Sequence, residues 1–455
     1  MLKNIHYQLI KRTAMQKFKM KLNSGLSFIY RTEGSESQVF EIRMKDDIDM
    51  NALYVAASIS FQRFPYLNCK LKIREDGAYI ESNPVVPMPV MTRHLRPIGG
   101  SSTISNLVDL TFWKRSLFVS FHHGLCDGHG IMPFIKTLIY YYLEGITGIA
   151  PDIPDVRLAG EQMLIGETAD PISEGNYTYD KGKVYKVDRT AYAIPEVVDG
   201  EPSGGNSWRY EMSIDATEFM AVCKANNCTP AILISILMQK AVLKLHPDAD
   251  KPIVSNVICD WRKTIGLPNT FRNCVSSIYL PYSKADEGKP LPEVGTADRD
   301  LLAKQRETDT ARALASVMVT MADMVDSRKT LEEKQQLVAG FNAHTVDSFI
   351  CSYLGKADMG EAEKYMDSIH IYTSGTRCMT MEIMSMAGKF TIDLTHNFAD
   401  DKYARAFVAE CAALGLECRC SEAIPYQVPK DHTRNTNFLK SLEMFWNEKV
   451  RPYFH

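Results

Sequence analysis

The strongest constraint on the fold is a strand that runs into a helix through a glycine-rich turn. Residues 117–123, LFVSFHH, alternate and are apolar as in a buried strand. Residues 131–143, IMPFIKTLIYYYL, place their apolar side chains at helical spacing. The linking segment GLCDGHG allows a tight return at Gly124, Gly128 and Gly130. The sequence therefore predicts one strand–turn–helix unit here.

Two adjacent histidines end this strand. Successive side chains of a strand point to opposite faces, so His122 and His123 cannot both face one cavity. One of them is a structural partner, and the other can act as a base, because an unperturbed imidazole has a pKa of about 6.5. Asp127 lies in the turn, where its short side chain either caps the helix or pairs with a cation from another segment.

A metal site is the alternative interpretation of the same stretch. His122, His123, Asp127 and His129 offer the right ligand types. Adjacent histidines on a strand diverge, however, and the sequence contains no H-E-x-x-H pattern. We therefore predict no metal site, and His129 has no assigned role. The absence of G-x-x-x-x-G-K-[ST] and G-x-S-x-G also disfavours a phosphate-binding loop and a serine hydrolase.

Helical and strand patterns occur on both sides of an irregular segment, residues 148–208, which is rich in Pro, Asp and Gly. Late consecutive strands indicate antiparallel or mixed sheets. The helix after the histidine turn is expected to end at Glu144 and Gly145, and Thr229 with Pro230 is expected to open a long helix. We predict an α/β fold with mixed sheets and two lobes, residues 1–180 and residues 181–455.

Composition narrows the class of protein. The 455 residues carry a net charge of −3, and no long basic run alternates with aromatic residues, so no nucleic-acid partner is expected. No stretch of 18 apolar residues occurs, and the basic N-terminus has no apolar core of a signal peptide. Eleven cysteines without zinc-ligand spacing favour free thiols. We expect a cytoplasmic monomer without a membrane span.

HHGLCDG resembles the H-H-x-x-x-D-G signature of the chloramphenicol acetyltransferase-like superfamily of CoA-dependent acyltransferases. That superfamily includes nonribosomal peptide condensation domains and alcohol O-acetyltransferases. Further segments resemble the superfamily in the same order, over residues 38–415: ALYVAASISFQRFPYLNCKL, TPAILISILMQKAVLKL, KPIVSNVICDWRK, FRNCVSS and SYLGKAD. The resemblance implies two acetyltransferase-like lobes that form a V, with an active-site tunnel between them.

The resemblance also implies roles for individual residues. His123 matches the catalytic general base, and His122 matches the supporting histidine. Asp127 matches a structural aspartate whose salt-bridge partner corresponds to Arg262. Gly128 matches the glycine that leaves room at the tunnel.

Late segments of the chain supply weaker candidates. SYLGKAD resembles the strand and glycine that line the tunnel, which makes Tyr353 and Gly355 candidate tunnel residues. Tyr353 and Ser374 are candidate donors to an oxyanion. No D-F-G-W-G segment is present, and nothing indicates an attached carrier or adenylation domain. This departure favours a stand-alone acyltransferase over a peptide-bond-forming condensation domain.

The implied reaction transfers an acyl group from a thioester to an alcohol or amine acceptor without a covalent acyl-enzyme. The thioester, on coenzyme A or an acyl carrier protein, is a co-substrate, and no bound cofactor is expected. Two alternatives remain open. One is a non-catalytic or condensation-domain-like module that binds a carrier protein or hydrophobic ligand, and the other is a zinc hydrolase.

Overall fold

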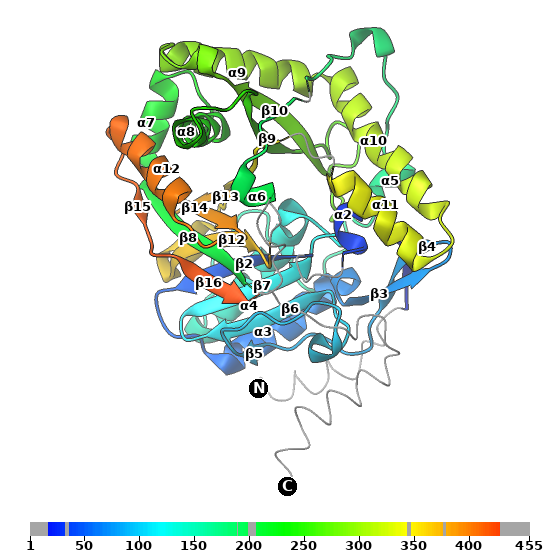
Figure 1. Ribbon diagram of the computed structural model, residues 1–455. Coiled ribbons are helices and arrows are strands. Elements are labelled where there is room, and N and C mark those ends of the chain that lie inside the picture. Colours follow the sequence, from blue (N-terminus) through cyan, green and yellow to red (C-terminus); the bar gives the residue numbers. More distant parts are fainter. Residues whose placement is uncertain are drawn as a thin grey trace.

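Three β-sheets with helices packed against them make up the computed structural model (Figure 1). It describes residues 17–31, 36–188, 190–198, 206–343, 347–375 and 379–427. The basic N-terminal residues 1–16, which bear on targeting, therefore lie outside the described residues. Both parallel and antiparallel strand pairs occur, so the prediction of a mixed α/β fold is confirmed.

The first-lobe sheet has five strands in the order β12-β2-β7-β6-β5. Their bounds are Met366–Thr373, Ser37–Met44, Ser116–His122, Val108–Trp113 and Val90–Met91. Helices α3 (Met50–Arg63) and α4 (Gly128–Thr147) pack against each other through Phe61 and Phe134, whose ring centroids are 4.8 Å apart. Both helices bury apolar side chains in one core with this sheet. The expected strand–turn–helix unit is thus β7 followed by α4.

Helix α4 continues past its expected end. Gly145 lies inside the helix, and Gly148 forms the C-cap in the left-handed conformation with φ +73°. A glycine inside a helix costs only about 1 kcal/mol, which the buried face of α4 readily offsets. The prediction of an end at Glu144 and Gly145 was therefore wrong by one turn.

The second-lobe sheet has eight strands, with the path β10-β9-β11-β13-β14-β8-β15 and β16 paired to β8. Their bounds are Val275–Tyr282, Ile253–Asp260, Phe349–Lys356, Thr380–Met386, Lys389–His396, Asn206–Asp215, Arg419–Cys420 and Ile424–Gln427. Helix α8 (Pro230–Leu245) is almost wholly buried in the core of this lobe. Its N-cap is Thr229 and Pro230 is in its first turn, as predicted.

The remaining helices pack against the first core, against the second core or against both. They are α2 (Leu26–Ile29), α5 (Pro171–Glu174), α6 (Pro195–Val198), α7 (Ala216–Ala225), α9 (Leu291–Arg306), α10 (Thr308–Asp326), α11 (Leu331–Ala343) and α12 (Lys402–Ala413). In the described chain, no single helix is long and apolar enough to cross a membrane, although the bent pair α7–α8 passes by composition and length alone.

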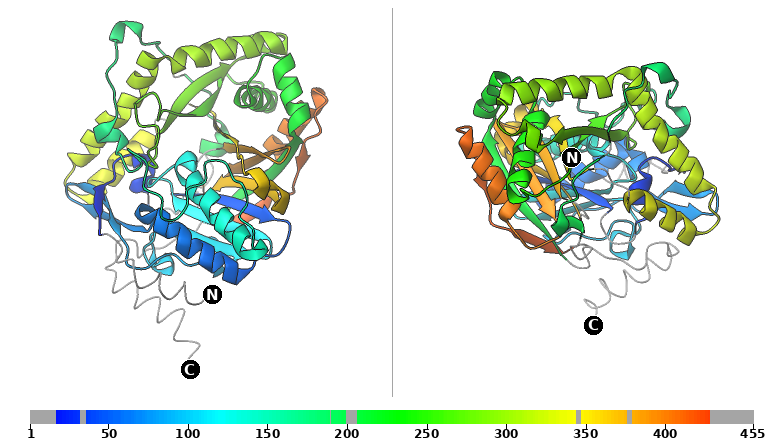
Figure 2. Two further views of the ribbon diagram at one scale, coloured as in Figure 1. Left: turned by 180° about the vertical axis from the view of Figure 1, so that it is seen from behind. Right: turned by 45° about the horizontal axis from the view of Figure 1, so that its top comes forward.

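Two elements connect the lobes, which Figures 1 and 2 show one above the other. Strand β12 follows three helices of the second half of the chain, yet it pairs with β2 in the first-lobe sheet. Helix α10 buries Ala311 and Ala315 in the second core and Ala322 and Val325 in the first. The division of the chain near residue 180 remains a prediction. The structure adds that β12 and part of α10, which follow this point in the sequence, belong to the first lobe.

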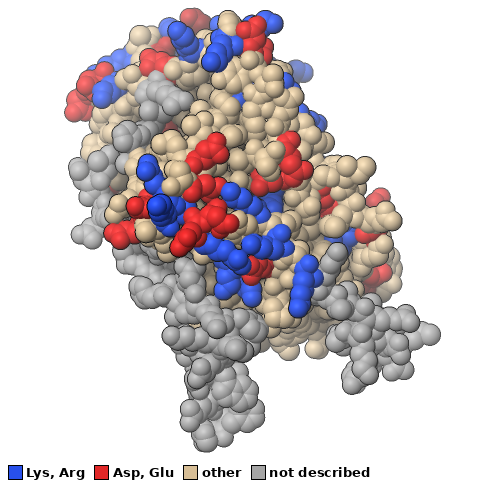
Figure 3. All heavy atoms as spheres, turned by 90° about the vertical axis from the view of Figure 1, so that its right-hand side faces the viewer, with Lys and Arg blue, Asp and Glu red and all other residues tan. Residues whose placement is uncertain are grey.

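A small sheet, β1-β4-β3, lies beside α10 and α11 at the edge of the molecule. Its strands are Lys19–Lys21, Gly77–Ser82 and Cys69–Arg74. Figure 3 shows positive and negative side chains intermingled on this face. Lys21 of β1 pairs with Asp326 of α10, its Nζ lying 2.5 Å from the carboxylate. The ten cysteines that the structure describes are free thiols, as predicted for that part of the chain.

Candidate active site

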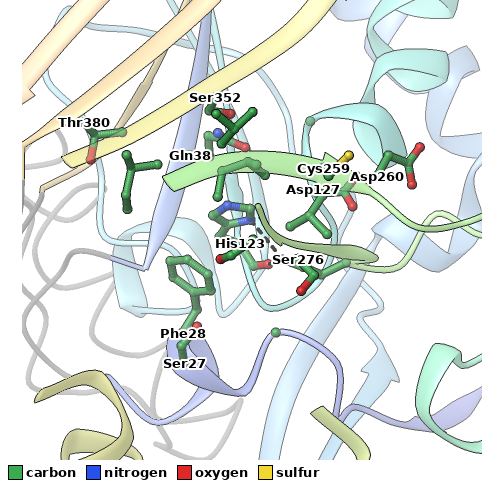
Figure 4. Close-up of a pocket in the computed structure, with 18 of the residues that line it drawn as sticks. Ser27, Phe28, Gln38, His123, Asp127, Cys259, Asp260, Ser276, Ser352 and Thr380 are labelled. Atoms are coloured by element: carbon green, nitrogen blue, oxygen red, sulfur yellow. Dashed lines mark hydrogen bonds between the residues drawn. The ribbon is translucent and has the colours of Figure 1, made fainter. Parts of the chain in front are cut away.

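A cavity of about 770 Å³ lies where the two lobes meet, and His123 is in its lining (Figure 4). The volume is in the range of pockets that hold small molecules. Residues of the helices α2, α4, α8, α9, α10 and α11 line part of the cavity, and residues of strands β2, β9, β10, β11, β12 and β13 and of the loops between elements line the rest. Both lobes are therefore needed to form it.

His123 is the first residue after β7, and its ring is held at Nδ1. Its Nδ1 lies 3.2 Å from the carbonyl oxygen of Cys126. Asn273 donates from Nδ2 to the His123 carbonyl at 2.8 Å, and that nitrogen also lies 3.2 Å from Nδ1. The carbonyl favours the tautomer with hydrogen on Nδ1, which leaves Nε2 as the nitrogen that can accept a proton. Burial lowers the pKa of His123, so the ring is neutral at neutral pH.

His122 has a different environment. The side chain is fully buried, it is not in the cavity lining, and its Nδ1 accepts a hydrogen bond from Gly124 N at 3.0 Å. Burial lowers its pKa to about 3, so it is uncharged. The two histidines thus point to different environments, which is what the strand alternation predicts.

Asp127 combines the two roles that its position allowed. As N-cap of α4 it accepts a hydrogen bond from Gly130 N at 2.8 Å. Arg262 donates from Nη2 to the same carboxylate at 2.8 Å, and Cys274 N donates to the other oxygen, also at 2.8 Å. Burial alone would raise the pKa of Asp127, but the charge and hydrogen bond of Arg262 hold it below its usual value.

Arg262 is itself buried and almost fully satisfied. Its Nε donates to Thr270 O at 2.8 Å, and its Nη1 lies 3.0 Å from Asp260. The pair with Asp127 joins the start of α4 to the segment between β9 and β10, across 135 residues of sequence. The structure therefore brings Asp127 and Arg262 together beside the cavity, where Asp127 contributes to the lining.

Two glycines permit close packing at the start of α4. A Cβ atom on Gly128 would lie 2.2 Å from Cδ2 of Leu354 in β11. A Cβ atom on Gly130 would lie 1.9 Å from the carbonyl oxygen of Phe271. Any side chain at these positions would push the turn away from the second lobe, and Gly128 also lies in the cavity lining.

The weaker candidates have different placements. Tyr353 lines the cavity, with its ring 5.9 Å from that of Phe390. Gly355 has φ +90° at the bulge of β11 and is outside the lining. Ser374 is buried outside the lining, and its Oγ accepts a hydrogen bond from Ser37 N at 3.2 Å. His129 is exposed and borders the cavity.

Sequence reasoning missed several residues around His123. The ring of Phe28 lies over the imidazole, with centroids 4.2 Å apart and planes inclined by 32°. Nothing in the LSFI segment around Phe28 indicates this contact. Asn273, in contrast, belongs to FRNCVSS, a segment already singled out, so its position could have suggested a role at the site.

One group of described side chains has the spacing of metal ligands: Glu211, His370 and Asp393. Arg43 and Arg209 already donate to Glu211. Asp393 contacts His370 Nδ1 at 3.1 Å and lies 3.5 Å from Arg209 Nε. Because arginines neutralise these carboxylates, the chemistry of the group fits an ion-pair network between the lobes better than a cation site.

The sequence matches no protein-family model and no curated protein. Solved structures are similar in fold. TRI101 from F. sporotrichioides, complexed with coenzyme A and T-2, has a TM-score of 0.57 and 15% identity, covering 90% of this chain and 100% of that one. TRI3 trichothecene 15-O-acetyltransferase from Fusarium sporotrichioides has a TM-score of 0.57 and 12% identity, covering 87% and 95%.

The first condensation domain of the CDA synthetase is similar to the same extent, with a TM-score of 0.55 and 13% identity over 86% of this chain and 95% of that one. The chain thus has the chloramphenicol acetyltransferase-like fold of CoA-dependent acyltransferases and condensation domains, with its two lobes. This confirms the fold that the sequence resemblance implied.

Proposed function

We propose that this chain is an acyltransferase that moves an acyl group from a thioester of coenzyme A or an acyl carrier protein to an alcohol or amine. The observation that carries the proposal is His123. Its Nδ1 faces the Cys126 carbonyl, and the residue lines a cavity between two lobes of the acyltransferase fold. A neutral base held in one tautomer within a chamber of substrate size is what direct acyl transfer requires.

In the proposed reaction, Nε2 of His123 takes the proton of the acceptor hydroxyl or amine as its oxygen or nitrogen attacks the thioester carbonyl. The new bond to carbon forms, and the carbonyl oxygen becomes an oxyanion. The carbon–sulfur bond then breaks, and the leaving thiolate takes the proton from His123. General-base catalysis of this kind contributes about 10²- to 10⁴-fold to the rate.

The other residues of the site would act through position. Asp127 and Arg262 fix the turn that carries His123, and Asn273 holds its main-chain carbonyl. Tyr353 remains a candidate donor to the oxyanion because it lines the cavity. The fold neighbour TRI101 was crystallised with coenzyme A, which supports coenzyme A as the first donor to test here.

The proposal is tested by thiol release from a panel of acyl-CoA and acyl-carrier thioesters with pooled alcohols and amines, and by product mass spectrometry. We expect turnover by the wild type and a loss of about 10²- to 10⁴-fold in His123→Ala. His94→Ala is the matched control, since His94 is exposed and outside the cavity lining, and it should keep full activity.

Two results would redirect the assignment. Turnover that survives in His123→Ala would remove the general-base role. No thiol release with any donor and acceptor would favour a module that binds a carrier protein or hydrophobic ligand without chemistry.

A further inference from the structure

Two polar side chains from different lobes meet inside the cavity. Gln38 is the second residue of β2 in the first-lobe sheet, and Glu382 is the third residue of β13 in the second-lobe sheet. Gln38 donates from Nε2 to Oε1 of Glu382 at 2.9 Å. Each side chain belongs to the cavity lining, and each residue is only 3% exposed to water. This hydrogen bond therefore links the two lobes at the wall of the site.

Each of these side chains keeps one oxygen without a partner among the described residues. The atoms are Oε1 of Gln38 and Oε2 of Glu382, and both are shielded from bulk water. Leaving a buried polar atom unpaired costs about 1–3 kcal/mol. Thr373, the register partner of Gln38 across the sheet, is also in the lining. Unpaired polar atoms are rare in folded proteins, and two from side chains of one cavity lining point to a ligand that completes them.

The protonation state of Glu382 decides which hydrogen-bond donors and acceptors Gln38 and Glu382 present to a ligand. Burial raises the pKa of Glu382 to about 8; the bond from Gln38 opposes this effect, and the charge of Asp393 adds to it. Asp393 is the register partner of Glu382 on β14 and is itself held by His370 and Arg209. At neutral pH the proton belongs on Oε2, because Oε1 accepts from Gln38. The pair then presents one donor, Glu382 O–H, and one acceptor, the Gln38 carbonyl.

The lining also offers residues suited to a thioester donor. Figure 4 shows Gln38 and Ser352 on one side of His123, with Phe28 on the other. The cavity lining includes Met318 and Met321 of α10, together with the cations Arg31 and Arg306. Apolar walls with cations suit a thioester donor that has an apolar arm and phosphates. A neutral donor–acceptor pair suits a hydroxyl, which both accepts and donates a hydrogen bond.

We propose that Gln38 and Glu382 form a subsite that binds a hydroxyl group of the acyl acceptor other than the one that is acylated. The acceptor is therefore a diol or polyol rather than a simple alcohol or amine. This inference rests on the proposed acyltransferase function and names the substrate class of the same cavity.

The first experiment compares matched pairs of acceptors, each a diol and the mono-alcohol of the same carbon skeleton, with acetyl-CoA as donor. We expect kcat/KM of the wild type to favour the diol by about tenfold, the value of one well-formed hydrogen bond. Glu382→Leu and Gln38→Leu should lose the preference, so that the ratio of kcat/KM for diol and mono-alcohol falls toward one. Asp367→Asn, at an exposed carboxylate of β12, is the control and should keep the preference.

Glu382→Gln separates recognition by a neutral pair from recognition by a carboxylate. A glutamine at this position still accepts from Gln38 and donates from its own amide, as the protonated acid does. It should therefore keep the diol preference, and should keep it above pH 8, where the wild type loses it as Glu382 ionises. If Glu382→Gln loses the preference as completely as Glu382→Leu, the neutral-pair subsite is wrong.

Thermal unfolding without thioester provides a readout that does not depend on turnover. Binding to the folded state raises the unfolding midpoint, so diols should raise that of the wild type and of Glu382→Gln, but not that of Glu382→Leu. Thiol release without any diol preference overturns the subsite and leaves the acyltransferase proposal standing. Selective protection by diols without thiol release overturns the acyltransferase proposal and leaves the subsite standing. Failure of both readouts overturns both proposals.

Discussion

At the residue scale, the proposed reaction requires a neutral imidazole at His123. Burial of His123 lowers its pKa below the usual value of 6.5, so the base form predominates across the neutral range. The active form is the deprotonated one, and activity should therefore fall only as the pH drops through this lowered pKa. We predict that log kcat/KM is level at neutral pH and declines on the acid side, with its midpoint below 6.5.

The measurement is a pH profile of thiol release, corrected for stability at each pH. Asn273→Ala is the informative companion, because it removes the hydrogen bond to the His123 carbonyl without touching the Cys126 contact. It should lower kcat and leave the direction of the profile unchanged. A midpoint above 6.5 in the wild type would show that a different group, or a charged histidine, governs the reaction.

Residues of the site differ in how far the sequence could predict them. Strand alternation alone separates His122 from His123, and the family signature supplies Asp127 with its distant partner Arg262. Gln38 and Glu382 could not be predicted, because a polar residue on an alternating strand has the same pattern whether it faces water or a cavity. Only the assembled lobes reveal that both are buried.

At the scale of elements, the N-cap of α4 does more than an ordinary cap. Asp127 bonds Gly130 N, Arg262 and Cys274 N at once, and it is 2% exposed. Removing one partner from a buried ion pair leaves an uncompensated charge. We predict that Asp127→Ala lowers the free energy of unfolding by about 3–5 kcal/mol, measured by denaturant titration.

Asp215 is the matched control, because it caps α7 through Thr217 N and Glu218 N at an exposed site. Asp215→Ala should cost only about 1 kcal/mol, the usual value of a cap. Equal losses in the two variants would mean that the Arg262 pair adds nothing to the stability of the turn.

The sequence predicts the elements well where periodicity and capping residues agree. Thr229 with Pro230 marks the start of α8 correctly, and β7 with α4 follows from the switch between two periods. Gly145 misled the prediction because a glycine ends a helix only where the chain turns to the left-handed conformation. That turn occurs at Gly148, and sequence alone does not distinguish the two glycines.

At the scale of the whole molecule, α10 makes the stability of one lobe depend on the other. Its first half is buried in the second core and its last turns in the first. Val317 lies between them and is 44% exposed. We predict that Val317→Pro, which breaks the helix at a cost of about 3 kcal/mol, increases amide hydrogen exchange in both β7 and α8.

Val317→Ala is the control, since a substitution at an exposed site changes stability by at most about 0.5 kcal/mol. An increase of exchange in one lobe only would show that the two cores unfold independently. The measurement is hydrogen–deuterium exchange followed by mass spectrometry at several denaturant concentrations.

The arrangement of the lobes was predictable only through the family resemblance. Periodicity identifies SIHIYTSG as a strand but does not tell which sheet it joins. Its neighbours in sequence, β11 and β13, pair with each other in the second lobe, and β12 leaves them for β2. Such a long-range choice depends on the packing of both cores, which local sequence does not contain.

The pairing of β12 with β2 also has a consequence for biosynthesis. Gln38 of β2 pairs with Thr373 of β12. The first-lobe sheet is therefore incomplete until a strand 335 residues later in the sequence has been made. The edge of β2 stays open while the ribosome makes the second lobe as far as β11, and an open edge can pair with other chains. A nascent chain of this protein thus has most need of chaperones until β12 has been made and can pair with β2.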